Sequence, residues 1–199
     1  MKIYGDRQSG NCFKVMLLCS LLNIEHEWVS VDILAGEAST DAFRKMNPSA
    51  KIPLLVLPDG RTLSESNAIL NFLAAGSFLL PSDSFALAKV QQWQFFEQYS
   101  HEPYIAVARF ISKYLGLPPE REAEYEAKQE GGNEALLVME TQLQNTPYLT
   151  GPEMTTADIS LYGYTHVANE GGFDLANYPA VQAWIDRVSS QPNYVGMPA

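Results

Sequence analysis

Cysteines and long apolar runs are scarce in this chain, and each scarcity excludes a class of protein. Its two cysteines, Cys12 and Cys19, are too few for a disulfide framework. If both lie on one helix, their Cα atoms are about 10 Å apart, which is too far to bridge. No apolar run approaches the roughly 18 residues that span a bilayer, and the N-terminus lacks the apolar stretch of an export signal. We therefore expect a reduced, cytoplasmic protein that does not bind membranes.

Basic residues and histidines are also few. Thirteen Lys and Arg residues stand against 23 Asp and Glu, and the net charge of −10 at pH 7 argues against nucleic acid and anionic membranes as partners. The three histidines, His26, His101 and His166, show no metal-ligand spacing, so no metal site is expected. The acidic run 120–134 is interpreted as the solvated face of a helix.

The composition that remains is that of a globular protein with two unlike halves. Apolar residues make up 46% of the chain and aromatic residues 11%, enough for a substantial core. Residues 1–80 hold seven basic and eight acidic side chains, whereas residues 81–199 hold six and fifteen. This difference in charge favours two domains.

Hydrophobic periodicity predicts an α/β order in the first part of the chain. Strands are expected at 2–5, 27–32 and 54–57, a hairpin turn at 58–61 leading into 62–63, and helices at 12–22, 40–46 and 65–75. Asn23 is expected to close the first helix, and Ser64 is expected to be the N-cap of the third. A βαβ unit followed by a hairpin and a covering helix is an α/β layer architecture.

The second part of the chain is predicted to be helical. Helices are expected at 85–115, 119–144, 157–170 and 179–191. The Pro- and Ser-containing stretch 77–84 precedes them and is typical of a linker. The predicted domains are therefore residues 1–76, a linker at 77–84, and an all-α domain at 85–199.

The first motif with chemical meaning is Ser9-Gly10-Asn11-Cys12, between the first strand and the first helix. Backbone N–H groups at a helix N-terminus favour an anion, and a thiolate held there has a lowered pKa. Thioredoxin-like proteins carry CxxC in this turn, but here the first position is a serine, so dithiol exchange is lost. A hydroxyl can still donate a hydrogen bond to a bound sulfur anion, although an ordinary N-cap explains Ser9 taken alone.

Two further motifs are ambiguous by themselves. Pro53 stands at the start of a buried strand, and a cis Ile52–Pro53 bond would leave the Ile52 backbone free to pair with a peptide. Glu65 and Ser66 open a helix whose amides could receive a ligand carboxylate, while Glu65 could receive an amino group. N-capping with a first-turn acid is the simpler interpretation of that second motif.

Together these motifs resemble the cytosolic glutathione transferase family, of the bacterial, serine type. The resemblance extends over almost the whole chain and combines many short motifs: Ser9 with Lys14-Val15, Asn47-Pro48, Lys51-Ile52-Pro53, Glu65-Ser66, Tyr148-Leu149-x-Gly151, Thr155-x-Ala157-Asp158-Ile159, and Tyr178-Pro179-Ala180-Val181-x-Ala183-Trp184. It implies an α/β thioredoxin-like N-terminal domain that binds glutathione and an all-α C-terminal domain that contributes the electrophile site.

The resemblance also implies roles for individual residues. Ser9 would hydrogen-bond the glutathione sulfur, with Asn11 as a plausible second donor or merely a turn residue. The tripeptide would be held by four further positions: by the backbone of Ile52 beside cis Pro53, by Glu65 and Ser66 at the γ-glutamyl end, and by Lys51 at the glycine carboxylate. Thr155 and Asp158 would form a structural capping box.

The expected activity is transfer of glutathione to an apolar electrophile by a homodimer, with glutathione as co-substrate and no other cofactor. The candidate electrophile pocket is lined by Tyr99, Tyr104, His101 and Arg109. Two alternatives stay open: a glutathione-dependent disulfide reductase or peroxidase, and a non-catalytic glutathione transferase-like binding protein. Two alternative site residues are also weighed. Tyr4 lies inside the first strand, and Cys12 on a helix face is more often a core residue than a reactive one.

Overall fold

The computed structural model describes residues 1–198, which cluster into two compact units. One unit is Met1–Ser77 together with residues 191–198, and the other is Phe78–Ser190. The first is a sheet with helices and the second is built of helices, so the predicted combination of an α/β domain and an all-α domain is confirmed.

The N-terminal unit is built on a four-stranded mixed sheet in the order β2-β1-β3-β4. The parallel pair β1–β2 is joined by α1, and β3 and β4 add antiparallel to β1 as a hairpin. The elements are β1 (Lys2–Gly5), α1 (Gly10–Leu21), β2 (Glu27–Ser30), α2 (Asp41–Met46), β3 (Leu54–Val56), β4 (Thr62–Leu63) and α3 (Ser66–Leu73).

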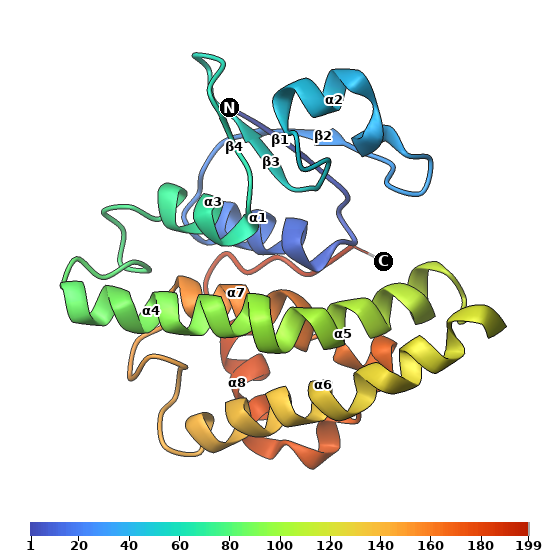
Figure 1. Cartoon of the computed structure of the whole chain (residues 1–199). Coiled ribbons are helices and arrows are strands. Elements are labelled where there is room, and N and C mark those ends of the chain that lie inside the picture. The colour runs from blue at the N-terminus through green and yellow to red at the C-terminus, as the bar shows by residue number, and fades with distance from the viewer. Residues whose placement is uncertain (199) are drawn as a thin grey trace. The chain divides into compact units, whose positions relative to one another are not determined.

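Alternation along β1 sends successive side chains to opposite faces of this sheet. Ile3 is fully buried in a cluster with Val15 of α1 and Ile69 of α3. Tyr4, one residue later, packs in the other cluster, where its ring meets Phe43 of α2 edge-on at 6.4 Å. In Figure 1, α1 and α3 accordingly lie on one side of the strands and α2 on the other.

The ends of two helices test the predicted capping residues. Asn23 follows α1 with a left-handed φ of 52°, as expected for a residue that closes a helix. The prediction for α3 is wrong, because the N-cap is Glu65 with φ 66° and ψ 111°, not Ser64. A positive φ is unfavourable for a side chain of this size, and such outliers mark places where the surrounding structure imposes a conformation.

The helical unit begins with α4 (Ser84–Phe96), which continues through two π-helical segments. These are η2 (Glu97–His101) and η3 (Phe110–Tyr114), and α5 (Glu102–Arg109) lies between them. The predicted helix 85–115 is therefore one helical path with two π segments, which periodicity alone does not reveal. Figure 1 shows α4 and α5 following one another along the same line.

Three more α-helices complete this unit: α6 (Glu122–Leu143), α7 (Thr156–Thr165) and α8 (Pro179–Ser189). The predicted helix 157–170 is shorter than expected and is followed by a 3-10 turn, Ala168–Gly171. The first amides of α8, at Ala180 and Val181, donate to the two carboxylate oxygens of Glu140 on α6. This long-range cap ties two helices together through groups that would otherwise lack partners.

The predicted capping box of α7 is confirmed. The Thr155 hydroxyl accepts from the first turn of the helix, while Asp158 Oδ2 accepts from the Thr155 amide at 2.9 Å. Asp158 is fully buried, and its Oδ1 also accepts from the Leu149 amide and from the indole of Trp184 at 3.0 Å. The motif therefore joins the start of α7 to α8.

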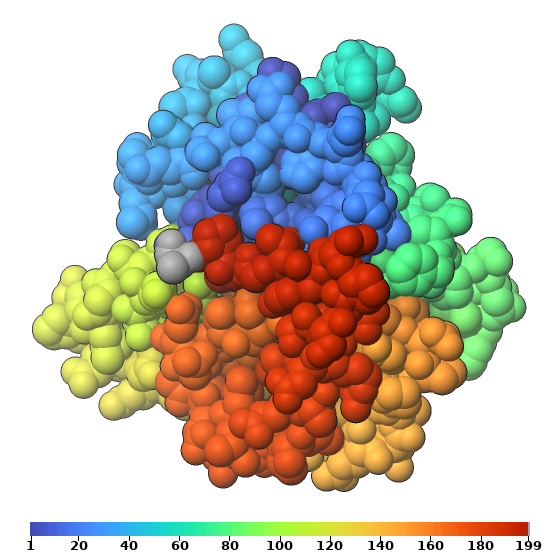
Figure 2. All heavy atoms as spheres, turned by 180° about the vertical axis from the view of Figure 1, so that it is seen from behind, coloured from blue at the N-terminus to red at the C-terminus, as the bar shows by residue number. Residues whose placement is uncertain are grey.

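The C-terminal boundary differs from the expected one. Residues 191–198 cluster with the N-terminal unit instead of the helical unit in which the range 85–199 had placed them. The Ser20 hydroxyl of α1 donates to the backbone oxygen of Asn193 at 2.7 Å. Figure 2 shows this last segment, in red, lying against the blue residues of the N-terminal unit. Unit 2 likewise begins at Phe78, inside the predicted linker.

Candidate active site

Ser9 occupies the N-cap of α1, between β1 and the helix. Its backbone is extended, with φ −70° and ψ 126°, and its side chain makes no capping hydrogen bond. The Ser9 carbonyl accepts the first bond of the helix from Phe13 at 2.8 Å. Because the Ser9 side chain does not cap the helix, the first backbone amides of α1 can donate to a bound anion.

The Cys12 thiol is fully buried and is hydrogen-bonded to Ser9. Burial raises the pKa of Cys12 to about 12, against smaller opposing effects of hydrogen bonds from Ser9 and from the Asp6 backbone. The thiol is therefore protonated at neutral pH, as its interpretation as a core residue requires.

Asn11 is joined to α3 by a buried polar cluster. Its Oδ1 accepts from Lys14 Nζ at 2.7 Å and from Ser66 Oγ at 3.0 Å, and Lys14 Nζ also lies 3.4 Å from Ser66 Oγ. Only an oxygen can accept from an ammonium group, so the contact with Lys14 fixes the orientation of the Asn11 amide. Its Nδ2 edge is turned away from Lys14 and Ser66.

Lys14 is a site residue that sequence reasoning missed. Its side chain is fully buried, whereas Lys and Glu are almost never buried without a specific partner. One signal was available, since Lys14 interrupts the apolar helical run that extends from Cys12 to Leu22. A lysine in an apolar helical run is ordinarily interpreted as a solvent-exposed position. Its partner Ser66 lies 52 residues away, so no local sequence pattern predicts their contact.

Asn47 holds the loop before β3, a role that the sequence analysis did not assign to it. Its side chain is buried. Its amide donates to the Lys51 carbonyl at 2.7 Å, and its Oδ1 accepts from the Ser49 amide and hydroxyl. The Ile52–Pro53 bond is cis, as predicted. Within residues 1–198 the Ile52 backbone groups form no hydrogen bond, so they remain available to an extended peptide.

Glu65 and Ser66 stand at the start of α3 in different surroundings. The Glu65 side chain is exposed, and the strained backbone at this residue immediately precedes the helix. Ser66 is buried and directs its hydroxyl to Asn11. The structure thus brings Asn11 and Ser66 into contact through side chains, while Lys51 is exposed on the loop before β3.

The four residues predicted for the electrophile pocket do not gather at one cavity. Tyr99, with 85% of its surface exposed, and Tyr104 line a cavity of about 230 Å³ in the helical unit. His101 is fully buried and its Nε2 lies 2.9 Å from the Thr165 hydroxyl. Arg109 pairs with Glu170 at 2.6 Å and is also buried. His101 and Arg109 do not line that cavity.

The described part of the chain holds neither a metal-binding cluster nor a membrane-spanning helix. Residues 1–198 contain no group of three His, Cys, Asp or Glu side chains arranged to hold a metal ion. None of the helices within that range combines the length and the apolar character needed to cross a membrane.

Two family profiles together match most of this chain. The family profile described as "Glutathione S-transferase, N-terminal domain" matches residues 8–75, and the one described as "Glutathione S-transferase, C-terminal domain" matches residues 93–192. A solved glutathione S-transferase from Pseudomonas fluorescens is 58% identical, with a TM-score of 0.98 over 100% of this chain and 98% of that one.

More distant relatives differ in their named activities. Glutathione S-transferase F13 of Arabidopsis thaliana is 31% identical, and the match covers 98% of this chain and 93% of that protein. The disulfide-bond oxidoreductase YfcG of Escherichia coli is 28% identical over 92% of this chain and 87% of its own length. Both halves of the chain are therefore similar to one family whose members carry out different reactions.

Proposed function

Because this chain belongs to the glutathione S-transferase family, we propose that it activates the glutathione thiol beside Ser9 and conjugates it to an electrophilic small molecule. The 58% identical neighbour from Pseudomonas fluorescens is consistent with a bacterial origin. Glutathione is the co-substrate, and the proposal requires no metal or other cofactor.

The observation that carries this proposal is the uncapped Ser9 hydroxyl at the N-terminus of α1. The hydroxyl donates to the glutathione sulfur, and the partial positive charge of the helix end stabilises the thiolate. The thiol proton passes to solvent, the thiolate forms a new carbon–sulfur bond, and the electrophile releases its leaving group or takes up a proton. Free thiol has a pKa of about 8.5, so a shift of about two units, worth roughly 2.7 kcal/mol, ionises most of the bound thiol at neutral pH.

The remainder of the tripeptide is proposed to lie along the sheet edge and the start of α3. The cysteinyl backbone pairs with Ile52, the γ-glutamyl carboxylate is received by Ser66, and its amino group by Glu65. Lys51 attracts the glycine carboxylate. The strained φ at Glu65 supports this role, because strain of this kind is concentrated at ligand-binding positions.

Lys14 is proposed to hold the γ-glutamyl end in place through Asn11 and Ser66. Replacement of Lys14 by methionine keeps the length of the side chain but removes its charge and both hydrogen bonds. We expect the Kd for glutathione to rise by about tenfold, which corresponds to about 1.4 kcal/mol. The reason is the loss of the attraction between the buried positive charge and the anionic tripeptide. Isothermal titration calorimetry at pH 7 measures the change.

Two comparison variants make this test specific. Lys14→Arg keeps the positive charge and is expected to recover most of the affinity. Lys2→Met removes an exposed lysine that pairs with Glu27 on the same unit and is expected to leave the Kd unchanged. A folded Lys14→Met protein with the Kd of the wild type would show that Lys14 has no part in glutathione binding.

A second candidate function is reduction of disulfides by the same thiolate, which the similarity to the E. coli oxidoreductase favours. The two activities are separated by steady-state assays with an aryl halide, a mixed disulfide and a hydroperoxide. Conjugation as the main activity requires the highest kcat/KM for the aryl halide. A non-catalytic role is disfavoured because the chain retains Ser9, Glu65 and Ser66, which such a role does not need.

Tyr99 and Tyr104, which line a cavity within the helical unit, remain the candidate residues for binding the electrophile. His101 and Arg109 are better explained as structural, since each is buried and bonded inside the helical unit. The internal Arg109–Glu170 pair is reinforced by Lys113, which lies 3.1 Å from the same carboxylate.

We also propose that the protein is a homodimer. The helical unit exposes large apolar side chains on α4 and α6, and a cavity of about 410 Å³ lies between these helices. The exposed side chains are Phe85, Phe95, Leu137 and Val138. Large apolar side chains left exposed on neighbouring helices are typical of association surfaces. Sedimentation equilibrium at micromolar concentration should give twice the mass of the 22.1 kDa chain, and Leu137→Glu should yield monomer. A monomeric wild type would contradict the proposal.

A further inference from the structure

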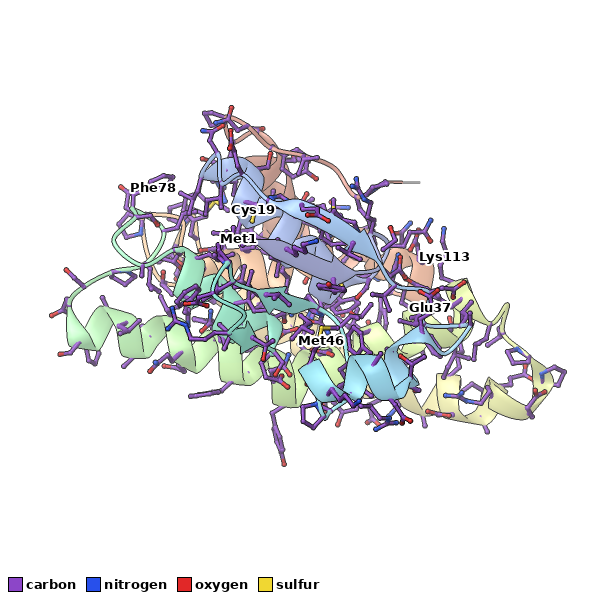
Figure 3. All side chains as sticks on the ribbon, turned by 90° about the horizontal axis from the view of Figure 1, so that it is seen from above. Met1, Cys19, Glu37, Met46, Phe78 and Lys113 are labelled. Carbon is purple, nitrogen blue, oxygen red and sulfur yellow. The ribbon has the colours of Figure 1, made fainter. Side chains whose placement is uncertain are left out.

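The N-terminal unit has a cavity that the proposed reaction does not use. It has a volume of about 500 Å³, within the range of roughly 300–1,000 Å³ that is usual for small-molecule sites. Met16, Cys19 and Ser20 contribute to one wall from α1, and Asn23, which follows the helix, extends that wall. Cys19 is labelled in Figure 3.

This wall faces away from the candidate active site. At about 100° per residue, Asn11 and Lys14 lie on the opposite side of α1 from Met16 and Ser20. Asn11 and Lys14 reach α3, whereas the cavity is bounded by Trp28 on the edge strand β2. The cavity and the Ser9–Ser66 site therefore occupy different flanks of the same helix.

Two residues that line the cavity carry polar groups that find no protein partner within residues 1–198. The Trp28 Nε1 is buried and has no hydrogen-bond partner among residues 1–198. The Arg7 guanidinium lies over the indole ring, 5.4 Å from its centroid, and forms no ion pair in the described part of the chain. Buried donors without an acceptor are rare in folded proteins, because each carries a desolvation cost.

The other residues that line the cavity indicate the polarity and charge of a ligand that would fit it. Met16, Ile24 and Val195 supply apolar surface, and Val195 belongs to the C-terminal segment that lies against α1. Glu25 also lines the cavity and opposes a second negative charge on the ligand. An arginine stacked on an indole, with apolar walls, suits a flat body that carries one carboxylate.

We propose that this cavity is a second ligand site, which binds a small organic monocarboxylate with a flat apolar body. The carboxylate pairs with Arg7 and offers an acceptor to the Trp28 indole, while the apolar body lies against Met16, Ile24 and Val195. The inference does not depend on the conjugation reaction, since none of these residues takes part in it.

The test uses 2-naphthoate with the full chain and the ¹⁵N-labelled indole signals of its three tryptophans. We expect the Trp28 Nε1–H signal, assigned through Trp28→Phe, to shift on titration while those of Trp93 and Trp184 move less. Arg7→Met is expected to weaken binding at least tenfold, and uncharged 2-naphthol to bind at least tenfold more weakly than 2-naphthoate.

Arg61→Met is the matched control, because Arg61 is an exposed arginine of the same unit that pairs with Asp59. It is expected to bind 2-naphthoate as the wild type does, and unchanged glutathione affinity in both arginine variants verifies that they are folded. A Trp28 signal that does not move, or an Arg7→Met protein with unchanged affinity for 2-naphthoate, would overturn the proposal.

Discussion

Replacing Ser9 by alanine is expected to lower kcat/KM for conjugation by about a hundred- to a thousandfold, the usual effect of losing one donor to a developing or bound anion. The affinity for glutathione should change less than about threefold, because the proposed contacts of the tripeptide with Ile52, Glu65 and Ser66 remain. Steady-state kinetics with an aryl halide and calorimetry with glutathione measure the two quantities.

The same substitution should move the pH dependence of the reaction. Without the hydroxyl, the pKa of bound glutathione returns toward the free value of about 8.5, so activity is recovered at alkaline pH. The ultraviolet absorbance of the thiolate reports this pKa directly. Ser9→Thr keeps a hydroxyl at the N-cap and should retain most of the activity. If Ser9→Ala turned over at the wild-type rate with an unchanged pH profile, another group, such as Asn11, would have to activate the thiol.

Replacing Asp158 by alanine should lower the free energy of unfolding by about 3–5 kcal/mol, as expected when a fully buried hydrogen-bonded carboxyl group is removed. Burial raises the pKa of Asp158, even though the carboxyl group accepts hydrogen bonds from the Leu149 amide, the Thr155 amide and hydroxyl, and the Trp184 indole. The alanine variant leaves these donors buried without an acceptor, and each unsatisfied donor carries a desolvation cost.

Urea denaturation followed by circular dichroism measures the loss. Asp186→Ala provides the control on the neighbouring helix α8, where the side chain is exposed, and should change stability by less than about 0.5 kcal/mol. The role assigned to Asp158 is structural, so kcat should be unchanged at a temperature where the variant is folded. A variant as stable as the wild type would contradict the importance of this buried network.

Sequence alone determined the features that depend on neighbouring residues. The α/β order of the N-terminal unit follows from the periods of its apolar residues, and the helical character of the second unit follows in the same way. Asn23 and the Thr155–Asp158 box were predicted correctly because a cap is formed by residues within one turn of each other. The turn at Ser9 could be recognised because strand, turn and helix follow directly in the chain.

Tertiary structure decided the features that depend on residues far apart in the chain. Lys14 meets Ser66, and Asn193 meets Ser20. The left-handed conformation of Glu65 is likewise imposed by its surroundings, since local preference favoured Ser64 as the cap. Such contacts have no period along the sequence, because they arise only when separate elements pack and buried polar groups must find partners.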